Sequence, residues 1–285
     1  MKILVIGATG VIGRHVIPRL VERGHFVRAV VRDAKQVPFL QIAGAKPVIG
    51  DIFDQDSLDH AAGDCEAALH LATAIPKSAD GDWTLNDRIR REGTRNFLAA
   101  VTRRGVKRYV QQSITLIYGD KGQSIVDESA PLQPTSVSQS AVDMEDVVRA
   151  SALDWCILRG GLLYGPSTGR EDAWRTAARQ NRLLLPGDGD GLISLIHVAD
   201  MARAIVAAAE NAPPGSVYNI VDDEPLSYKR LFTHIAAQLD RSAPLAGGPI
   251  FLPSLGCAND RVKNELPWQP SYPSYRSGLA LRPSC

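Results

Sequence analysis

Cysteine is scarce in this 285-residue chain. The four cysteines, Cys65, Cys156, Cys257 and Cys285, stand far apart. No two of them form a CxxC pair and no histidine lies at metal-ligand spacing, which argues against a disulfide scaffold and against a zinc motif. We therefore expect a reduced, cytoplasmic compartment and no metal.

An excess of charge of one sign is also lacking. The 32 Lys and Arg residues nearly balance the 31 Asp and Glu residues, and this net charge of +1 argues against nucleic acid and anionic membrane as partners. No apolar run approaches the roughly 20 residues that span a bilayer, and Met1 leads directly into an apolar segment without a charged leader. We expect a soluble protein that is not exported and whose partner is a small molecule.

Hydrophobic residues make up 45% of the chain, enough for a large core. Strand-like segments alternate with segments of helical periodicity. This order predicts an α/β fold in which helices cover both faces of a parallel sheet, with ligands at the carboxyl ends of the strands. After an opening strand, the expected strands lie at 25–33, 47–51, 65–72, 107–113 and 154–159, and the expected helices at 83–101, 138–152 and about 171–181.

The first strand turns into the first helix through the glycines of Gly7-Ala-Thr-Gly-Val-Ile-Gly13. Gly7 permits the turn, Gly10 lets the backbone approach a pyrophosphate, and Gly13 allows close packing of the helix. The N–H groups that begin the helix favour a bound anion. A tight turn needs glycine with or without a ligand, but this strand and helix context favours nucleotide binding.

Composition changes after residue 160, where glycine and proline mark several loops. We expect a nucleotide-binding domain at 1–160 plus about 192–212, the latter stretch returning to the main sheet. The remaining segments, about 161–191 and 213–285, are expected to form a smaller substrate-binding region. Their loops carry no readable recognition motif.

Several motifs are distributed along almost the whole chain. Besides the glycine turn they are Asp51-Ile52, His70-Leu-Ala-Thr73, Glu92-Gly-Thr-Arg-Asn96, Ile157-Leu-Arg159, Tyr164-Gly-Pro166, Ile196-His-Val-Ala-Asp200, Val217-Tyr-Asn219 and Glu265-Leu-Pro-Trp268. In these motifs the chain resembles the extended and atypical branches of the short-chain dehydrogenase/reductase superfamily, often called NAD-dependent epimerase/dehydratases. The resemblance implies a Rossmann-type, doubly wound parallel sheet.

The resemblance also implies where an NAD(P) cofactor would bind. Gly160 replaces a proline that is frequent in the family, so the loop beside the nicotinamide is expected to be less rigid. The residues implied at the pyrophosphate are Gly7, Thr9, Gly10, Val11, Ile12 and Gly13; at the adenine, Asp51 and Ile52; at the ribose, Leu71, Ala72 and Thr73; and at the nicotinamide, Gly160, Leu162 and Leu163.

The choice between NAD and NADP is predicted from the end of the second strand. NAD-binding proteins usually place an acid there for the ribose hydroxyls, whereas this chain has Arg32 there and Arg14 after the glycine turn. Guanidinium groups suit a phosphate, so the residues favour NADP over NAD. The alternative is that Arg32 is only a solvated charge at a strand end.

A proton-transfer pair is missing. The resembled family carries a Tyr and a Lys four residues apart on the helix after the fifth strand, and these positions correspond here to Val137 and Ala141. None of the seven tyrosines is followed four residues later by a lysine. Tyr118 and Lys121, three apart, are interpreted as turn residues.

Three functions remain open on the sequence. The first is hydride transfer to a quinone, enone or other conjugated carbonyl compound, with hydrogen bonds or water as the proton source. The second is a non-redox isomerase, cyclase or lyase, and the third is a cofactor-sensing binding protein. We favour the first, in which Ser113, Thr115 and Tyr118 are the candidates to hold or protonate a substrate oxygen; their alternative role is packing.

Other polar residues are interpreted as structural. His70 and His197 are expected to serve packing and orientation, and Asp143, Glu145 and Asp146 to form a solvated acidic edge. A last group is aromatic: Trp83, Trp174 and Tyr164 are candidates to line a pocket for an aromatic or polycyclic substrate, although core packing is their default role. By analogy with the family, the helices at 83–101 and 138–152 would pair two chains in a homodimer.

Overall fold

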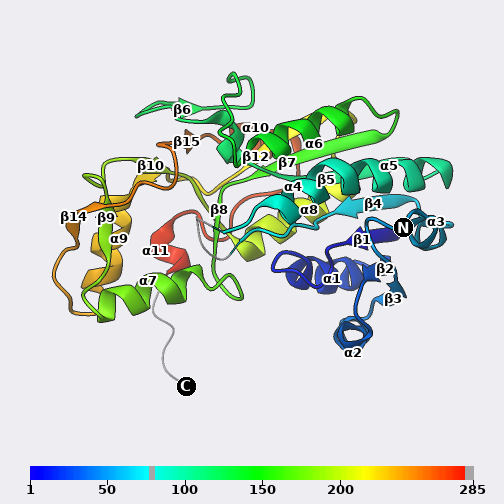
Figure 1. The fold of residues 1–285 in the computed structure, drawn as a ribbon, viewed down its shortest axis with the longest axis horizontal. Helices are drawn as coiled ribbons and strands as arrows, with labels where there is room; N and C mark the ends of the chain where they lie inside the picture. Colours follow the sequence, from blue (N-terminus) through cyan, green and yellow to red (C-terminus); the bar gives the residue numbers. More distant parts are fainter. Residues whose placement is uncertain (77–80, 280–285) are drawn as a thin grey trace.

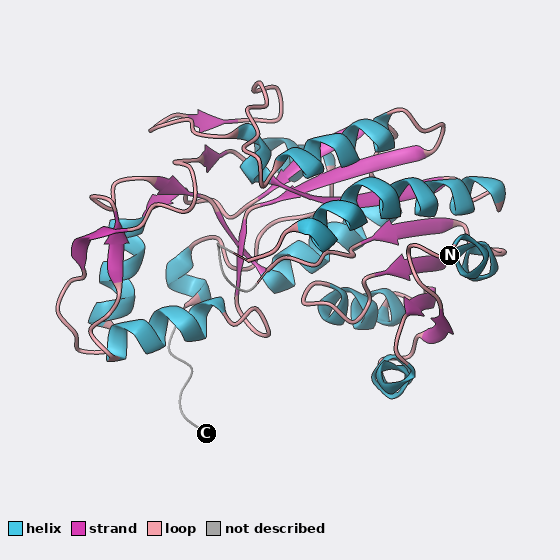
Figure 2. Cartoon of the chain, in the orientation of Figure 1, coloured by secondary structure: helices cyan, strands magenta, loops and turns pink. Residues whose placement is uncertain are grey.

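The protein is described by a computed structural model over residues 1–76 and 81–279 (Figures 1 and 2). Its centre is a seven-stranded sheet with the strand order β12-β7-β5-β4-β1-β2-β3, in which all neighbouring strands are parallel. This confirms the predicted α/β class and the doubly wound sheet. The strands of this sheet are β1 (Lys2–Ile6), β2 (Phe26–Val31), β3 (Lys46–Ile49), β4 (Ala67–His70), β5 (Arg108–Ile114), β7 (Asp154–Gly160) and β12 (Ser216–Ile220).

Alternating apolar residues explain why both faces of the sheet are covered. On β1, Ile3 and Val5 join one buried cluster, which includes residues of α1 and α8. Leu4 and Ile6 point the other way and join a second cluster, which includes residues of α3, α5 and α6. Successive side chains of a strand project to opposite faces, so one short apolar segment packs against two helical layers.

The helices vary in length, and three of them form one continuous segment. Residues Thr84–Arg103 run from α4 through the π-helical turn η2 into α5, which matches the long helix predicted at 83–101 except that it begins one residue later and ends two residues later. The helices are α1 (Gly13–Glu22), α2 (Val37–Ile42), α3 (Gln55–Ala62), α4 (Thr84–Arg88), η2 (Ile89–Gly93), α5 (Thr94–Arg103), α6 (Gln139–Arg149), α7 (Arg170–Arg179), α8 (Val198–Asn211), α9 (Tyr228–Ala237), α10 (Asp260–Glu265) and α11 (Tyr275–Gly278), with the 3-10 turns η1 (Ala34–Gln36) and η3 (Thr115–Tyr118).

The later part of the chain builds a smaller layer beside the sheet, seen with α7 and α9 on the left of Figure 1. Its own apolar cluster includes Tyr164, Leu195, Phe232 and Tyr275. Four small two-stranded sheets join β8 to β11, β9 to β14, β10 to β13 and β6 to β15. Their strands are β6 (Ile125–Val126), β8 (Leu162–Tyr164), β9 (Leu184–Pro186), β10 (Leu192–Ile193), β11 (Leu195–His197), β13 (Leu226–Ser227), β14 (Leu245–Gly248) and β15 (Gly256–Cys257).

The stretch at 192–212 contacts the main sheet through a helix. Its strand β11 pairs with β8 in a separate small sheet, while α8 contributes most of its buried residues to the cluster beneath the main sheet. No strand of this stretch joins the main sheet. The last strand that does so along the chain is β12, which lies within the range 213–285 expected for the substrate-binding region.

The strand order reverses between β1 and β4. The chain proceeds from β1 outward to β2 and β3, then returns to β4 on the opposite side. In sheets of this kind the crevice at such a reversal, outside the carboxyl ends of the strands, is where ligands bind. The glycine turn after β1 lies at this position.

None of the helices in the described part of the chain combines the length and the apolar character that crossing a bilayer requires.

Candidate functional site

The glycine turn is held tightly between β1, β4 and α1. Gly7 has a φ of +84°, and a Cβ atom there would lie 2.5 Å from the backbone nitrogen of Ala72. A Cβ atom on Gly13 would lie 2.3 Å from the carbonyl oxygen of Gly7. A Cβ atom on Gly10 would meet only that same oxygen, at 3.3 Å. Gly7 and Gly13 are therefore fixed by packing, whereas Gly10 is exposed and leaves room above the turn.

The turn presents unused backbone donors to this space. No hydrogen bond among the described residues uses the N–H groups of Val11, Ile12 or Gly13. The Thr9 hydroxyl donates to Gln36 Oε1 at 3.1 Å, which ties the turn to the segment after β2. Free N–H groups at the start of a helix favour an anion, so the geometry fits the pyrophosphate of a dinucleotide.

Positive charge gathers at the end of β2. Arg32 is exposed, and no ion pair among the described residues uses its guanidinium group. The Arg14 guanidinium lies 4.5 Å from the centre of the Phe39 ring. The Asp33 carboxylate accepts the N–H of Lys35 at 2.8 Å, so it caps the turn η1.

The predicted adenine and ribose residues follow β3 and β4. The Asp51 carboxylate accepts the N–H of Phe53 at 2.8 Å, and Ile52 is buried. Beyond β4, Leu71 is buried while Ala72 and Thr73 become progressively exposed. These positions lie at the carboxyl ends of β3 and β4, which β1 and β2 separate in the sheet.

The predicted nicotinamide residues lie where β7 leads into β8. A Cβ atom on Gly160 would lie 3.3 Å from the sulfur of Met201, and one on Gly161 would lie 2.6 Å from the carbonyl oxygen of Ser194. The half-buried Leu162 and Leu163 continue into β8. Glycine is thus required at position 161 by a close backbone approach, and little space remains beside Gly160.

A buried polar network lies behind the carboxyl end of β5. Ser113 donates to Glu145 Oε1 at 2.6 Å, and Arg159 Nη2 donates to Glu145 Oε2 at 2.7 Å. Arg159 Nη1 donates to the Tyr118 hydroxyl at 2.7 Å, and that hydroxyl donates to Asn219 Oδ1 at 2.9 Å. All five side chains are buried.

The network corrects one sequence expectation. Glu145 was expected on a solvated acidic edge together with Asp143 and Asp146, but its side chain is fully buried. Asp146 is exposed, and Asp143 pairs with Arg91 at 2.7 Å. Glu145 is buried because it pairs with Arg159 on β7, which supplies a buried cation. The spacing of the acids on α6 does not reveal this contact between helix and strand.

Two of the three oxygen-holding candidates belong to this network. The hydroxyls of Ser113 and Tyr118 are both engaged with protein groups, and burial raises the pKa of Tyr118 to about 12. Thr115 is buried at the start of η3. The three residues therefore lie together at the end of β5.

The start of α6 holds the positions at which the family's Tyr and Lys are expected. Val137, just before the helix, is exposed, and Ala141 is buried in the first turn. Between them the hydroxyl of Ser140 accepts a hydrogen bond of 3.2 Å from Arg90 Nη1. A guanidinium group thus reaches this helix end from η2, an arrangement that the sequence spacing does not indicate.

Both histidines that were interpreted as structural are buried. His197 Nδ1 accepts the N–H of Ala199 at 3.2 Å, and its ring packs against Tyr164 and Tyr272. His70 Nε2 lies 3.3 Å from the Thr94 hydroxyl, and burial lowers the pKa of His70 to about 4. His70 is therefore neutral at physiological pH.

The three aromatic residues predicted near a substrate do not form one cluster. Tyr164 and Trp174 belong to the apolar core of the smaller layer. Trp174 packs against Phe232, with ring centres 5.8 Å apart. Trp83 instead directly precedes α4 and is not part of that core.

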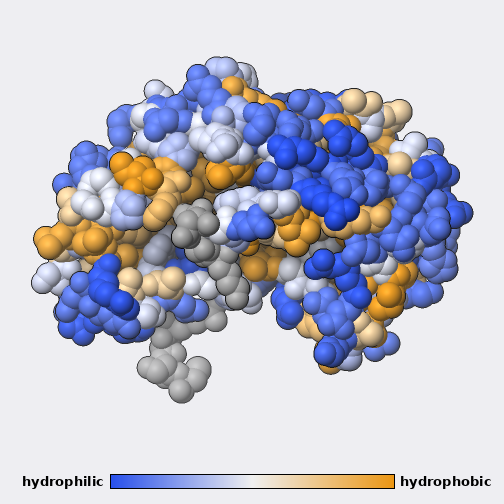
Figure 3. All heavy atoms as spheres, in the orientation of Figure 1, coloured by the Kyte–Doolittle hydropathy of each residue, from blue (hydrophilic) through white to orange (hydrophobic). Residues whose placement is uncertain are grey.

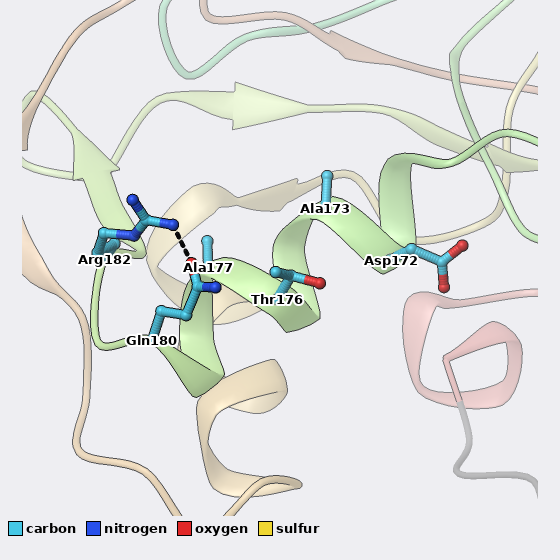
Figure 4. Close-up of a pocket in the computed structure, with 6 residues that line it drawn as sticks. All are labelled: Asp172, Ala173, Thr176, Ala177, Gln180 and Arg182. Atoms are coloured by element: carbon cyan, nitrogen blue, oxygen red, sulfur yellow. Dashed lines mark hydrogen bonds between the residues drawn. The ribbon is translucent and has the colours of Figure 1, made fainter.

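A depression of about 520 Å³ lies on α7, away from the switch point (Figure 4). It is lined by Asp172, Ala173, Thr176, Ala177, Gln180 and Arg182. Figure 3 shows further apolar surface over β9 and β14, where Leu184 and Leu245 are exposed. Neither surface brings together groups that could carry out chemistry, and within residues 1–76 and 81–279 no three His, Cys, Asp or Glu side chains gather as a metal site would require.

Comparison with known proteins assigns the class. Residues 3–221 match the model of the NAD dependent epimerase/dehydratase family. The 3-diazoavenalumate denitrifying reductase of a Streptomyces species is 34% identical over 98% of this chain and 99% of its own. The 2-alkyl-3-oxoalkanoate reductase of Stenotrophomonas maltophilia strain K279a is 30% identical over 83% of this chain and 75% of its own. A structure described as MoeE5 in complex with UDP-glucuronic acid and NAD superposes with a TM-score of 0.84, at 24% identity over 98% and 97% of the two chains.

The chain belongs to the NAD-dependent epimerase/dehydratase family, and the resemblance inferred from its motifs is confirmed. It is an enzyme of the NAD(P)-dependent oxidoreductase type that acts on a small molecule. A nicotinamide dinucleotide is its cofactor class, and the glycine turn fits that group.

Proposed function

We propose that this chain is an NADP(H)-dependent reductase whose substrate is already strongly electrophilic, such as a quinone, an enone or another conjugated carbonyl compound. The proposal rests on the start of α6, where Val137 precedes the helix and Ala141 lies in its first turn, at the two positions for which the family resemblance implies a proton-transferring pair. Neither side chain can move a proton. A delocalised acceptor tolerates this loss, because its developing charge is spread over several atoms and water can protonate it.

Arg32 and Arg14 support NADP as the preferred cofactor form. Arg32 directly follows β2, the Arg14 guanidinium packs on Phe39 of α2, and the Asp33 carboxylate is used to cap η1. A phosphate on the adenosine ribose would find a cation there rather than a carboxylate. When bound, the reduced dinucleotide supplies the hydride for the reaction.

Ser113, Thr115 and Tyr118 are proposed to form the oxygen-binding side of the site. The proton of Tyr118 is directed at Asn219, and its oxygen accepts from Arg159. Tyr118 is therefore suited to hold the end of β5, and with it the neighbouring Thr115, in place beside the substrate oxygen, while water supplies the proton.

A diazo compound is a second candidate for the acceptor. The most extensively matching relative named above is a denitrifying reductase of 3-diazoavenalumate, and the alignment covers almost all of both chains. An arenediazonium ion accepts one hydride and releases dinitrogen, leaving the arene with a C–H bond in place of the C–N bond. No proton is consumed, so this reaction does not need a tyrosine.

The two named relatives favour a substrate that carries a carboxylate. Both 3-diazoavenalumate and 2-alkyl-3-oxoalkanoate are named as anions of carboxylic acids. We propose that the substrate of this chain is an aromatic carboxylate bearing the electrophilic group.

We also propose that two copies of the chain pair through the continuous helical segment α4, η2 and α5 and through α6, which correspond to the helices predicted at 83–101 and 138–152. These helices contact one another on one face of the sheet and form the surfaces through which a homodimer was expected. Light scattering on the purified protein should give the mass of two chains, and the mass of one chain would contradict this pairing.

The function is tested by following NADPH oxidation in the presence of quinones, enones and arenediazonium salts, each with and without a carboxylate. Turnover of at least one class supports the reductase, and the class that turns over assigns the acceptor. Tight NADPH binding without oxidation by any of them would contradict the proposal and favour a non-redox or binding role.

A further inference from the structure

Arg90 is a buried guanidinium group without a carboxylate partner. It lies in the π-helical turn η2 and is only 3% exposed. The two arginines nearest to it in the sequence are both in ion pairs: Arg88 with Glu92 at 2.7 Å, and Arg91 with Asp143 at 2.7 Å. Arg90 itself forms no ion pair within the described ranges, and its one hydrogen bond is to the hydroxyl of Ser140.

This arrangement is energetically unfavourable in the protein alone. Burial lowers the pKa of Arg90 to about 10, so the group remains charged at neutral pH. Asp87, one turn earlier, attracts it at longer range; the Asp87 Oδ2 atom pairs with Arg91 at 3.5 Å, and its Oδ1 atom is buried without a hydrogen bond in the described part of the chain. A buried charge is normally paired, and one left without a counter-ion is stabilised when an anion binds beside it.

Arg90 shares its helix face with other unused donors. Asn86, four residues earlier, is fully buried; its Oδ1 accepts the N–H of Ala74, whereas its Nδ2 has no acceptor in the described part of the chain. The Nε1 atom of Trp83, three residues before Asn86, is also buried without an acceptor in the described part of the chain. Residues three or four apart on a helix lie on one face. This face therefore offers N–H donors and a positive charge.

The face lies beside the reaction site. The bond from Asn86 to Ala74 places it next to the segment that leaves β4, and the bond from Arg90 to Ser140 places it against the first turn of α6. That turn contains Ala141, where the family's lysine is expected. Both segments border the carboxyl ends of the central strands, where the nicotinamide is proposed to bind.

We propose that Arg90, assisted by Asn86, binds the carboxylate of the substrate and orients its electrophilic group toward the cofactor. The inference rests on the proposed aromatic carboxylate substrate. A carboxylate supplies both the missing counter-ion and the acceptor oxygens that these donors lack. The competing assignment is that Arg90 donates to the ribose beside the nicotinamide and contacts no substrate.

The test uses trans-cinnamate and its uncharged analogue trans-cinnamamide as probes of the full chain loaded with NADP+. Isothermal calorimetry should show that wild-type protein binds cinnamate at least about tenfold more tightly than cinnamamide, as a charged hydrogen-bonded pair implies. Arg90→Gln should abolish this preference and leave NADP+ affinity within about twofold of wild type. Arg90→Lys should keep part of the preference, because it keeps the charge but not the planar fork.

Arg91→Gln is the matched control. Arg91 contacts α6 through Asp143 just as Arg90 contacts it through Ser140, but it is half exposed and already paired. This variant should bind cinnamate as wild type does. Thermal melting controls for folding: removal of an unpaired buried charge in Arg90→Gln should leave the melting temperature unchanged or raise it.

Three results would overturn the carboxylate subsite. They are an equal affinity of wild type for the two probes, no binding of cinnamate at all, and a loss of NADP+ affinity in Arg90→Gln with cinnamate binding unchanged. The last result would assign Arg90 to the ribose. None of these binding results depends on NADPH oxidation, so the failure of the subsite is distinguishable from failure of the reductase proposal.

Discussion

At the scale of single residues, Tyr118 connects a charge pair to the end of a strand. Its hydroxyl accepts from Arg159 and donates to Asn219, so both of its hydrogen-bonding capacities are used inside the protein. A tyrosine in this state holds its surroundings more readily than it releases a proton, and burial raises its pKa to about 12.

Tyr118→Phe should therefore affect stability more than turnover. We expect the free energy of unfolding to fall by about 1–3 kcal/mol, because two buried groups lose their partner, while kcat falls less than about tenfold. Urea denaturation and steady-state kinetics would measure both. Tyr109→Phe, which removes another buried hydroxyl with a single bond to Gln111, is the control. Unchanged stability with a kcat loss of about a hundredfold would make Tyr118 the proton donor instead.

Arg32 is expected to decide between the two cofactor forms. Arg32→Gln should weaken NADP+ binding by about tenfold or more, because a charge-assisted bond to phosphate is lost. NAD+ binding should be unchanged. Fluorescence titration with both forms is the measurement, and an equal change in both affinities would remove Arg32 from the phosphate site.

Asp222 gives a prediction about pH. Burial raises its pKa to about 8, and its Oδ2 has no partner among the described residues. Its folded pKa lies above its unfolded value, so its contribution to stability is complete below about pH 4 and is lost as the pH rises toward 8. Asp222→Asn should accordingly gain stability relative to wild type between pH 5 and 8, by up to about 4 kcal/mol at about 1.4 kcal/mol per pH unit. Urea denaturation of Asp222→Asn and wild type at pH 5 and at pH 8 tests this. An equal difference in the free energy of unfolding at both pH values would contradict it.

At the scale of elements, the glycine turn contains one glycine that is required for packing, Gly13, and one that leaves room for a ligand, Gly10. Gly13 has no room for a methyl group beside the backbone of Gly7 and Ala8, whereas Gly10 has room on all but one side. The two glycines should therefore respond differently to the same substitution.

Gly13→Ala should lower the melting temperature by several degrees, since α1 must move away from β1. Gly10→Ala should keep the wild-type melting temperature yet bind NADP+ at least about tenfold more weakly, because its methyl group projects where the pyrophosphate is proposed to lie. Calorimetry and thermal melting on the pair would measure these effects. Normal cofactor affinity in folded Gly10→Ala would place the dinucleotide elsewhere.

Most of the helices and strands could be predicted from local pattern. The apolar run before Gly7 and the alternation through residue 160 determine a doubly wound sheet, because each segment has only one way to bury its apolar side chains. The π-helical turn at Ile89–Gly93 could not be predicted, since its residues have ordinary helical spacing. The last strand, β12, was not placed either, because its pairing with β7 joins segments about 60 residues apart, as the register of Tyr218 with Leu158 shows.

The candidate site could be predicted only in part, for a similar reason. The turn residues follow from glycine geometry, which is local. The pairing of Glu145 with Arg159 and the reach of Arg90 to Ser140 depend on contacts between separate elements, so sequence spacing gives no sign of either. Glu145 consequently looked like a surface acid, and nothing in the sequence distinguished Arg90 from the arginines beside it.

At the scale of the whole molecule, the structure joins a conventional dinucleotide crevice to an unusual reaction site. The sheet, the glycine turn and the family membership all indicate a nicotinamide enzyme. Beside that crevice, Val137 and Ala141 stand where the family resemblance led us to expect a proton-transfer pair, and the buried Arg90, which forms no ion pair among the described residues, donates to Ser140 between them. We propose that such a site suits acceptors that take a hydride without assistance from an acid.

The most direct test of this account is the transfer of deuterium from NADPH, labelled at its transferable position, to an electrophilic aromatic carboxylate. Mass spectrometry of the product should detect one deuterium on carbon for a diazonium, enone or other carbonyl acceptor. With a quinone, where label on oxygen would exchange with water, the oxidation of NADPH would be followed instead. Cofactor that binds but stays reduced, with no label in any product, would contradict the claim that this chain is a reductase.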